Sequence, residues 1–191
     1  GTRNPMDAPP VLAGSTAGGV TRSGRGVGVE PVCGRLVGEN AIFQGPTGSI
    51  PVTSETAVYI ASPDQSVYAF DAFDLSLLWR VRTARPLEEQ IALINGVLYV
   101  PTQDRGLLAL DAATGTELWN APDVLGQVLT TNASALTVWS QGRTWSVSVA
   151  DGSVIASHAL PGVRRLVADK AVDGALYAVS DANIVAKLMQ R

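Results

Sequence analysis

The chain has 191 residues, of which 46% are hydrophobic and 16% are charged, a composition that excludes a disordered chain and predicts a folded domain. The formal net charge is -3 and no run of like charge occurs, so we expect no nucleic acid partner. No stretch approaches the ~18 consecutive apolar residues that a membrane-spanning helix needs.

The first thirty residues are rich in Gly, Pro, Ser and Thr and show no helical or strand periodicity. Such a segment buries too little apolar surface to offset its ordering entropy. We expect an extended tail over residues 1–30, either a linker or an arm that clasps a partner, whose removal over residues 1–28 leaves folding nearly unchanged. Because the chain begins with Gly1 rather than Met, a signal peptide, anchor or larger upstream piece is expected to have been removed.

Residues 31–191 are expected to form one domain, because a repeat of about 40 residues runs through most of them. The segments 57–79 and 97–119 align without a gap. Four pairs of identical residues recur in them: Tyr59 and Tyr99, Ala69 and Ala109, Asp71 and Asp111, Trp79 and Trp119. A third copy (136–157) is interpreted as about two residues shorter at its last turn, with Ser157 at the Trp position, and a fourth begins at residue 175.

Within each copy, β-branched and aromatic runs of four to six residues alternate with turn clusters, which is typical of short strands. A further strand candidate precedes each copy, at residues 49–53, 90–94, 127–131 and 165–168. The prediction is an all-β fold with almost no helix: a β-propeller of about four blades, each a four-stranded antiparallel sheet. Tyr59, Tyr99 and Tyr177 should then occupy equivalent strand positions.

The run Ala-x-Asp-x-x-Thr-Gly-x-x-x-Trp at residues 109–119 resembles the tryptophan-docking repeat of PQQ-like, quinoprotein-type β-propellers, and the resemblance extends over residues 48–191. It implies that Trp79 and Trp119 pack between adjacent blades. Repeats of this kind occur in quinoprotein dehydrogenases, in BamB-like outer-membrane assembly lipoproteins and in sensor domains of bacterial kinases. A dehydrogenase would need a complete eight-bladed ring and a calcium site, and this sequence has too few blades and a single cysteine.

Few side chains suit catalysis or metal binding. His158 is the only histidine and Cys33 the only cysteine, so neither a catalytic relay nor a metal cage can be assembled from several such residues. We therefore expect no catalytic residue, no metal and no cofactor bound by this chain alone. The candidates for binding are exposed loop and aromatic residues: Arg164, Arg165, Trp139 and Trp145.

The resulting hypothesis is a non-catalytic binding or scaffolding module, and not an enzyme. It would be exported to the periplasm or cell envelope of a bacterium and docked on a protein partner, as an accessory subunit of an envelope-assembly, respiratory, photosynthetic or secretion complex. The preference for Arg over Lys supports a bacterial source, since only Lys170 and Lys187 are lysines. The alternatives are a fragment of a PQQ-dependent dehydrogenase and a ligand-sensing domain of a receptor kinase.

The ring is expected to close within one chain, because a strand left unpaired would expose backbone donors and acceptors. On this view, part of residues 35–44 pairs with residues 183–188 and completes the last blade. The alternative is a half-ring completed by a second chain or by further sequence.

Overall fold

The computed structural model describes residues 10–21, 25–33, 35–41 and 49–188, and every regular element within them is a β-strand. The strands form five antiparallel sheets, which we number as blades 1 to 5. Blades 1 and 2 contain β1 (Val11–Ala13), β2 (Thr16–Val20), β3 (Arg25–Val29) and β4 (Leu36–Ala41), then β5 (Val52–Thr53), β6 (Ala57–Ser62), β7 (Ser66–Asp71) and β8 (Leu77–Arg82). Blade 3 contains β9 (Ala92–Ile94), β10 (Val97–Thr102), β11 (Gly106–Asp111) and β12 (Glu117–Ala121). Blades 4 and 5 contain β13 (Gln127–Thr131), β14 (Ala135–Ser140), β15 (Arg143–Ser148) and β16 (Val154–Ala159), then β17 (Val163–Ala168), β18 (Leu176–Ser180) and β19 (Val185–Leu188).

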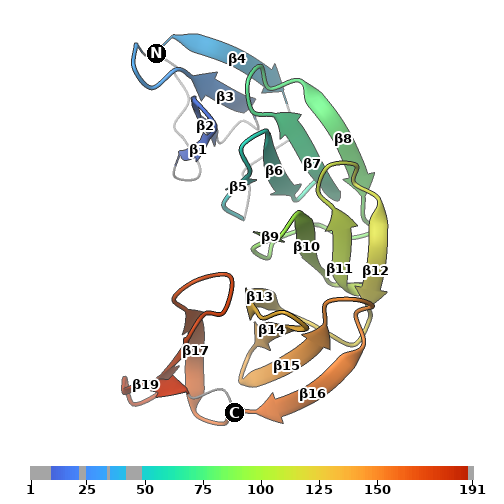
Figure 1. Ribbon diagram of the computed structural model, residues 1–191, viewed down its shortest axis with the longest axis vertical. Helices are drawn as coiled ribbons and strands as arrows, with labels where there is room; N and C mark the ends of the chain where they lie inside the picture. Colours follow the sequence, from blue (N-terminus) through green and yellow to red (C-terminus); the bar gives the residue numbers. More distant parts are fainter. Residues whose placement is uncertain (1–9, 22–24, 34, 42–48, 189–191) are drawn as a thin grey trace.

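The five blades follow one another around an open arc (Figure 1). The first strand of each blade lies on the inner side of the arc, where β1, β5, β9, β13 and β17 contact one another in turn. The fourth strands β4, β8, β12 and β16 lie on the convex side. This is the arrangement of propeller blades, so the all-β propeller prediction is confirmed, with five blades rather than about four.

The prediction of an extended tail over residues 1–30 is wrong from residue 11 onward. Three strands, β1 to β3, lie in that segment, and β4 completes them as a four-stranded blade. The segment was misinterpreted because glycine occupies many of its strand positions, which hides the alternation typical of a sheet. Removing residues 1–28 would therefore take away most of a blade. Residues 1–9 lie outside the described part of the chain.

The predicted closure of the ring is also wrong. β4 pairs with β3 and completes blade 1, and among the described residues β4 and β19 do not pair with each other. Blades 1 and 5 lie at the two ends of the arc (Figure 1). Residues 42–44 of the proposed closing segment lie outside the described residues.

The strand register confirms that Tyr59, Tyr99 and Tyr177 are equivalent. Each lies on the second strand of its blade, opposite the third-strand residue ten positions later in the chain: Ala69, Ala109 and Lys187 respectively.

The register corrects the alignment of the third copy. The Asp111–Gly115 turn and the Ser148–Gly152 turn have the same length, because equivalent backbone hydrogen bonds close both. The shortening lies upstream of this last turn, and Ala156 rather than Ser157 occupies the Trp position, opposite Ser146.

Trp79 and Trp119 pack in the interfaces between adjacent blades, which we call seams. Trp79 lies in the seam between blades 2 and 3, and Trp119 lies in the seam between blades 3 and 4. Trp79 Nε1 donates a hydrogen bond to the carbonyl oxygen of Ala112 (3.0 Å), and Trp119 Nε1 donates one to that of Val149 (2.9 Å). On its own blade, each indole packs against the equivalent tyrosine ring, with centroids 5.9 Å apart in both pairs. The implied docking of Trp79 and Trp119 between adjacent blades is present.

A glycine makes room for each indole. A Cβ at Gly115 would lie 2.8 Å from the Trp79 ring, and a Cβ at Gly152 would lie 2.5 Å from the Trp119 ring. The Asp111 carboxylate holds the first of these turns by accepting hydrogen bonds from the backbone N–H and the hydroxyl of Thr114, both 2.8 Å, and these bonds lower the pKa of Asp111. Only a bare backbone at this point allows the ring to lie flat against the next blade.

The seam between blades 1 and 2 reverses this arrangement. The row Tyr59, Ala69 and Trp79 of blade 2 corresponds to Gly18, Gly28 and Gly38 of blade 1. In blades 3 and 4, the turn that contacts the indole of the preceding blade contains a glycine. The equivalent residue of blade 2 is Leu75, which keeps the positive φ, at 60°. The Leu75 side chain lies against Gly28, since a Cβ there would be 3.1 Å from Leu75 Cδ1. A side chain of blade 2 thus fills a hollow in blade 1, instead of an indole of blade 1 covering blade 2.

The seam between blades 4 and 5 uses a third solution. Ala156 supplies no indole, and Trp139 of β14 packs instead with Leu166, Leu176 and Ala178 of blade 5. The 169–174 loop also binds β13: Thr131 N donates to the carbonyl oxygen of Ala171 (2.8 Å), and Gly174 N donates to Thr130 Oγ1 (2.9 Å).

The first prediction concerns the indole seams. Trp119→Ala should lower the free energy of unfolding by about 2–4 kcal/mol, because it leaves a cavity and strips Val149 of a hydrogen-bond donor. The adjacent and exposed Leu118→Ala should change it by less than about 0.5 kcal/mol. Urea unfolding followed by circular dichroism measures both, and equal losses would contradict the role of the indole.

The second prediction concerns the reversed seam. Gly38→Trp alone should destabilise the fold by at least about 2 kcal/mol, because a Cβ at this position would lie 2.4 Å from Asp74 O and Leu75 fills the space for the ring. Combining it with Leu75→Gly should recover about 1–3 kcal/mol of that loss as coupling energy. Additive effects in this double-mutant cycle would show that the two positions do not complement each other.

Candidate interaction surface

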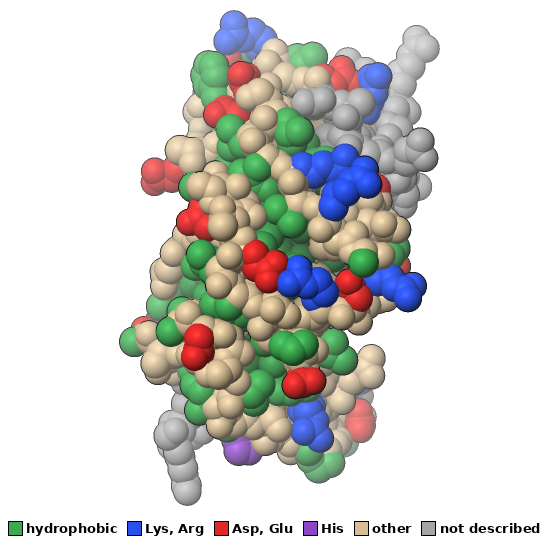
Figure 2. All heavy atoms as spheres, turned by 90° about the vertical axis from the view of Figure 1, so that its right-hand side faces the viewer, with side chains coloured by type: hydrophobic (Ala, Val, Ile, Leu, Met, Phe, Trp, Pro, Cys, Tyr) green, Lys and Arg blue, Asp and Glu red, His purple; other side chains and the backbone are tan. Residues whose placement is uncertain are grey.

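Exposed aliphatic side chains lie on the convex rim of four successive blades. They occupy one or both of the two positions before the Trp position on each fourth strand: Leu36, Leu77 and Leu78, Leu118, and Val154 and Ile155. We call these six residues the rim band. Leu78 is 49% exposed, Leu118 is 51% exposed and Ile155 is 58% exposed. Figure 2 shows the convex side, where hydrophobic side chains run along the middle of the face.

The geometry of a propeller blade explains the rim band. The fourth strand is an edge strand, so its backbone pairs on one side only, and the Trp position is turned into the seam. The two residues before the Trp position lie just after the turn between the third and fourth strands. No other blade of the described part of the chain covers their side chains. An apolar surface of this kind, repeated along a rim, marks an interaction site more often than chance exposure does. The sequence shows one or two aliphatic residues before each Trp position. It does not show whether those side chains are exposed to solvent.

Two ion pairs lie within single blades near the rim. Arg105 of blade 3 makes two hydrogen bonds to Glu117 (2.7 and 2.9 Å), and these raise the pKa of Arg105. In blade 1, Arg25 forms a salt bridge with Glu39. Such exposed pairs add little stability. At these two blades, the charges beside the rim band offset each other.

Blade 2 carries a polar cluster at its β6–β7 hairpin. The Tyr68 hydroxyl donates to Asp64 Oδ2, while the Arg80 guanidinium lies 5.0 Å from the centre of the Tyr68 ring and donates to Ser66 Oγ. Burial, followed by this hydrogen bond, raises the pKa of Tyr68. Asp64 Oδ1 is buried without a hydrogen-bond partner. Blade 3 has Gly106, Leu108 and Asn120 in place of Ser66, Tyr68 and Arg80, so it lacks this cluster.

The structure separates the aromatic pair proposed from sequence. Trp145 lies opposite Val138 and therefore on the other face of the sheet from Trp139. Trp139 packs toward blade 5 and Trp145 toward the core shared with blade 3, so neither offers a binding surface.

The other sequence candidates are exposed and scattered. Arg164 donates a hydrogen bond to Asn183 Oδ1 (3.3 Å), and its neighbour Arg165 is also exposed. His158 lies on β16, and the Cys33 thiol donates to Glu30 Oε2 (3.0 Å). The structure brings none of these four residues together into a site.

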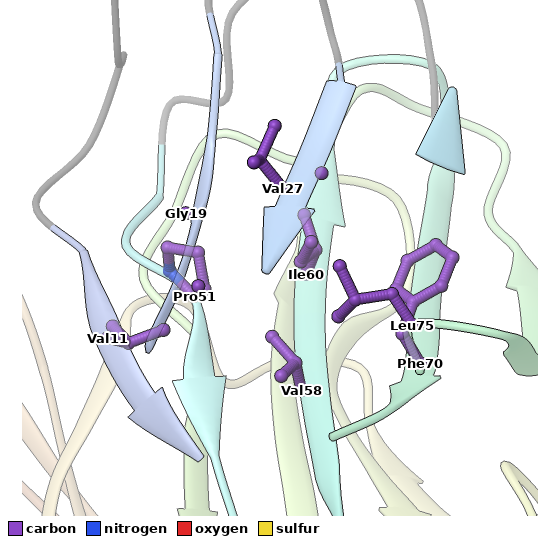
Figure 3. A pocket seen from close by; sticks show the side chains of 10 residues that line it. Val11, Gly19, Val27, Pro51, Val58, Ile60, Phe70 and Leu75 are labelled. Atoms are coloured by element: carbon purple, nitrogen blue, oxygen red, sulfur yellow. The ribbon is translucent and has the colours of Figure 1, made fainter. Parts of the chain in front are cut away.

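A small apolar pocket lies in the reversed seam between blades 1 and 2 (Figure 3). Its walls include Val11, Pro51, Val58, Ile60, Phe70 and Leu75, and its volume is ≈ 20 Å³. That is room for about one water, and the nearly all-apolar lining offers a water molecule few hydrogen-bond partners. The pocket is the space that Leu75 does not fill over the glycines of blade 1.

Among the described residues, no three His, Cys, Asp or Glu side chains gather in a group that could hold a metal ion. The described part of the chain also contains no helix long and apolar enough to cross a membrane.

Comparison with solved structures places the fold. The computationally designed Ika8 protein has a TM-score of 0.75 at 12% identity, over 93% of this chain and 56% of that one. BamB from Moraxella catarrhalis has a TM-score of 0.56 at 18% identity, over 100% of this chain and 71% of that one. The quinohemoprotein alcohol dehydrogenase ADHIIG from Pseudomonas putida HK5 has a TM-score of 0.64 at 13% identity, over 98% of this chain and 41% of that one.

These identities show a shared fold, and the chain spans about half the length of the designed protein (56%) and less of the dehydrogenase. No curated protein is detectably similar in sequence. The sequence model described as outer membrane protein assembly factor BamB matches residues 11–188, which include the glycine-rich first blade. The chain therefore belongs to this family of BamB-like, PQQ-repeat β-propellers.

Proposed function

We propose that the chain is a non-catalytic scaffold that binds a protein partner at its convex rim. The observation that carries this proposal is the rim band, in which four successive blades expose an aliphatic side chain at one or both of the two positions before the Trp position. Rigid seams on either side of each blade hold these side chains in a fixed array, so a partner can bury them without first ordering the scaffold.

The partner proposed is a membrane protein complex of the bacterial envelope, with the chain as an accessory subunit on the periplasmic side. The description of the matching family as an outer membrane protein assembly factor supports envelope assembly over a respiratory, photosynthetic or secretion complex. The similarity in fold to BamB from Moraxella catarrhalis supports the same choice.

The dehydrogenase alternative receives less support. The fold is shared with a quinohemoprotein alcohol dehydrogenase, at 13% identity. A calcium ion beneath a quinone needs several oxygen ligands from carboxylates and amides. In the described part of the chain, no three His, Cys, Asp or Glu side chains gather in a group that could hold a metal ion, so a calcium site there would have to rely mainly on amide and carbonyl oxygens. No feature of the described residues favours a receptor-kinase sensor.

The third prediction tests the rim. A photo-crosslinking residue placed at Leu78 or Leu118, in the bacterium that produces the chain, should form an adduct with a subunit of a membrane protein complex. The same residue at Glu89, which is exposed in the loop between blades 2 and 3, should not. Leu78→Glu combined with Leu118→Glu should weaken binding to that subunit at least tenfold and leave the thermal midpoint nearly unchanged, because both side chains are exposed.

Two outcomes would contradict the proposal. One is equal cross-linking from Glu89 and from the rim, which would remove the rim as the binding surface. The other is dye reduction by the chain after addition of pyrroloquinoline quinone and calcium, which would establish the dehydrogenase alternative.

A further inference from the structure

The fourth strands of the blades differ in how they protect their free edge. An edge strand carries unpaired backbone N–H and C=O groups, and charged side chains usually keep other strands away from it. β4 has Glu39, β8 has Arg80 and Arg82, and β12 has Glu117. β16, with the sequence Val-Ile-Ala-Ser-His-Ala, has no Lys, Arg, Asp, Glu or Pro.

The side chains of β16 are also the most open of these strands. Five of its six residues are exposed, with Val154 at 46% and Ile155 at 58%. The charged group in contact with it is Arg143 of the neighbouring strand β15, whose Nη1 donates to Ser157 Oγ (3.2 Å). That contact engages a side chain of β16 and leaves the backbone of its outer edge untouched.

The hydrogen-bond pattern identifies the groups that β16 presents outward. Leu160 N donates to the carbonyl oxygen of Gly142 (2.7 Å), one step beyond the last pair of the β15–β16 ladder. Because bonded and non-bonded pairs alternate in an antiparallel ladder, Ala156 and His158 direct their backbone groups toward β15. The backbone groups of Ser157 and Ala159 therefore point away from the sheet, whereas Ile155 lies in the bulge between the pairs of Ala156 and Val154, where this alternation is interrupted.

We propose that β16 pairs with β16 of a second copy of this chain, antiparallel and centred on Ser157, so that the two blades form one continuous sheet. In this register Ser157 faces Ser157 and Ile155 faces Ala159, and the bonded pair at Ser157 exchanges about two backbone hydrogen bonds. The charge pattern selects this occupant and this strand. In the equivalent register, self-pairing of β4 or β8 would place Glu39 opposite Glu39 or Arg80 opposite Arg80. On β12 the position equivalent to Ala159 is Pro122, which has no N–H to donate, whereas β16 carries neither a charged residue nor a proline.

This interface lies at blade 4 and overlaps the rim band at Val154 and Ile155. The partner-binding test above uses Leu78 and Leu118 of blades 2 and 3, so the two proposals can fail separately. Two copies joined at β16 would present two rim surfaces to one complex and so raise its avidity.

The first experiment traps the pair by a disulfide. Ser157→Cys, in a Cys33→Ser background, should form a covalent dimer under mild oxidation, because facing residues of a bonded antiparallel pair lie about 5.5 Å apart at Cα. Asn120→Cys is the matched control, since it occupies the corresponding position on β12. We expect cross-linking from Ser157→Cys to be at least tenfold faster than from Asn120→Cys. Equal rates would overturn the proposal.

The second experiment measures self-association by sedimentation velocity over a concentration series. The unsubstituted chain should dimerise, and Ile155→Lys should weaken dimerisation at least tenfold by placing two like charges on the paired edge. Leu118→Lys, at the equivalent position of β12, should not. Ser157→Pro should also weaken it, because it removes an outward N–H without breaking the ladder to β15. Circular dichroism checks that the variants are folded. A chain that stays monomeric at every concentration, or a dimer unaffected by Ile155→Lys, would overturn the proposal.

Discussion

The contact on which the fold depends most is that of an indole ring with the bare backbone of a glycine in the next blade. A blade by itself is a small sheet with two apolar faces, and it gains stability only when both faces are covered. Trp79 and Trp119 join three blades through the same pair of contacts, a hydrogen bond to a turn carbonyl and a flat approach to Gly115 or Gly152. Because each blade contacts only its neighbours, the stability of the arc is close to a sum over its seams.

The seams that lack this contact show what it must accomplish. Between blades 1 and 2 the aromatic row becomes three glycines, and Leu75 enters from the other side. Between blades 4 and 5 a tryptophan elsewhere on the sheet and a hydrogen-bonded loop take over. Each seam therefore requires that side chains fill the space between its two blades. Either blade can supply those side chains. The same rigid stacking carries the exposed rim band along the convex face, where the proposed partner would bind (Figure 2).

Much of this architecture could be predicted from the sequence. The spacing of 40 residues between Trp79 and Trp119 was sufficient for the propeller, the strand order within a blade and the equivalence of the tyrosines. Blade 1 could not be predicted, since the residues that define the repeat, tyrosine and tryptophan, are replaced there by Gly18 and Gly38. The predicted ring closure failed for the same reason: once the first three strands were missed, β4 was left without a partner in its own blade.

The rim band and the open edge of β16 could not be predicted from the sequence. A short aliphatic strand has the same sequence pattern whether it is buried in a core or exposed at an edge. The position of each strand within its sheet decides the matter, and that position depends on pairing between segments far apart in the chain.

The exchange of Gly38 and Leu75 makes blades 1 and 2 a matched pair. A tryptophan at position 38 and a leucine at position 75 would compete for the same space, so a chain holding both could not pack its first seam as this one does. Neither position can take the residue of the regular repeat unless the other changes with it. Blade 1 therefore cannot be exchanged for a copy of blade 2 or blade 3 unless the turn of blade 2 is changed as well.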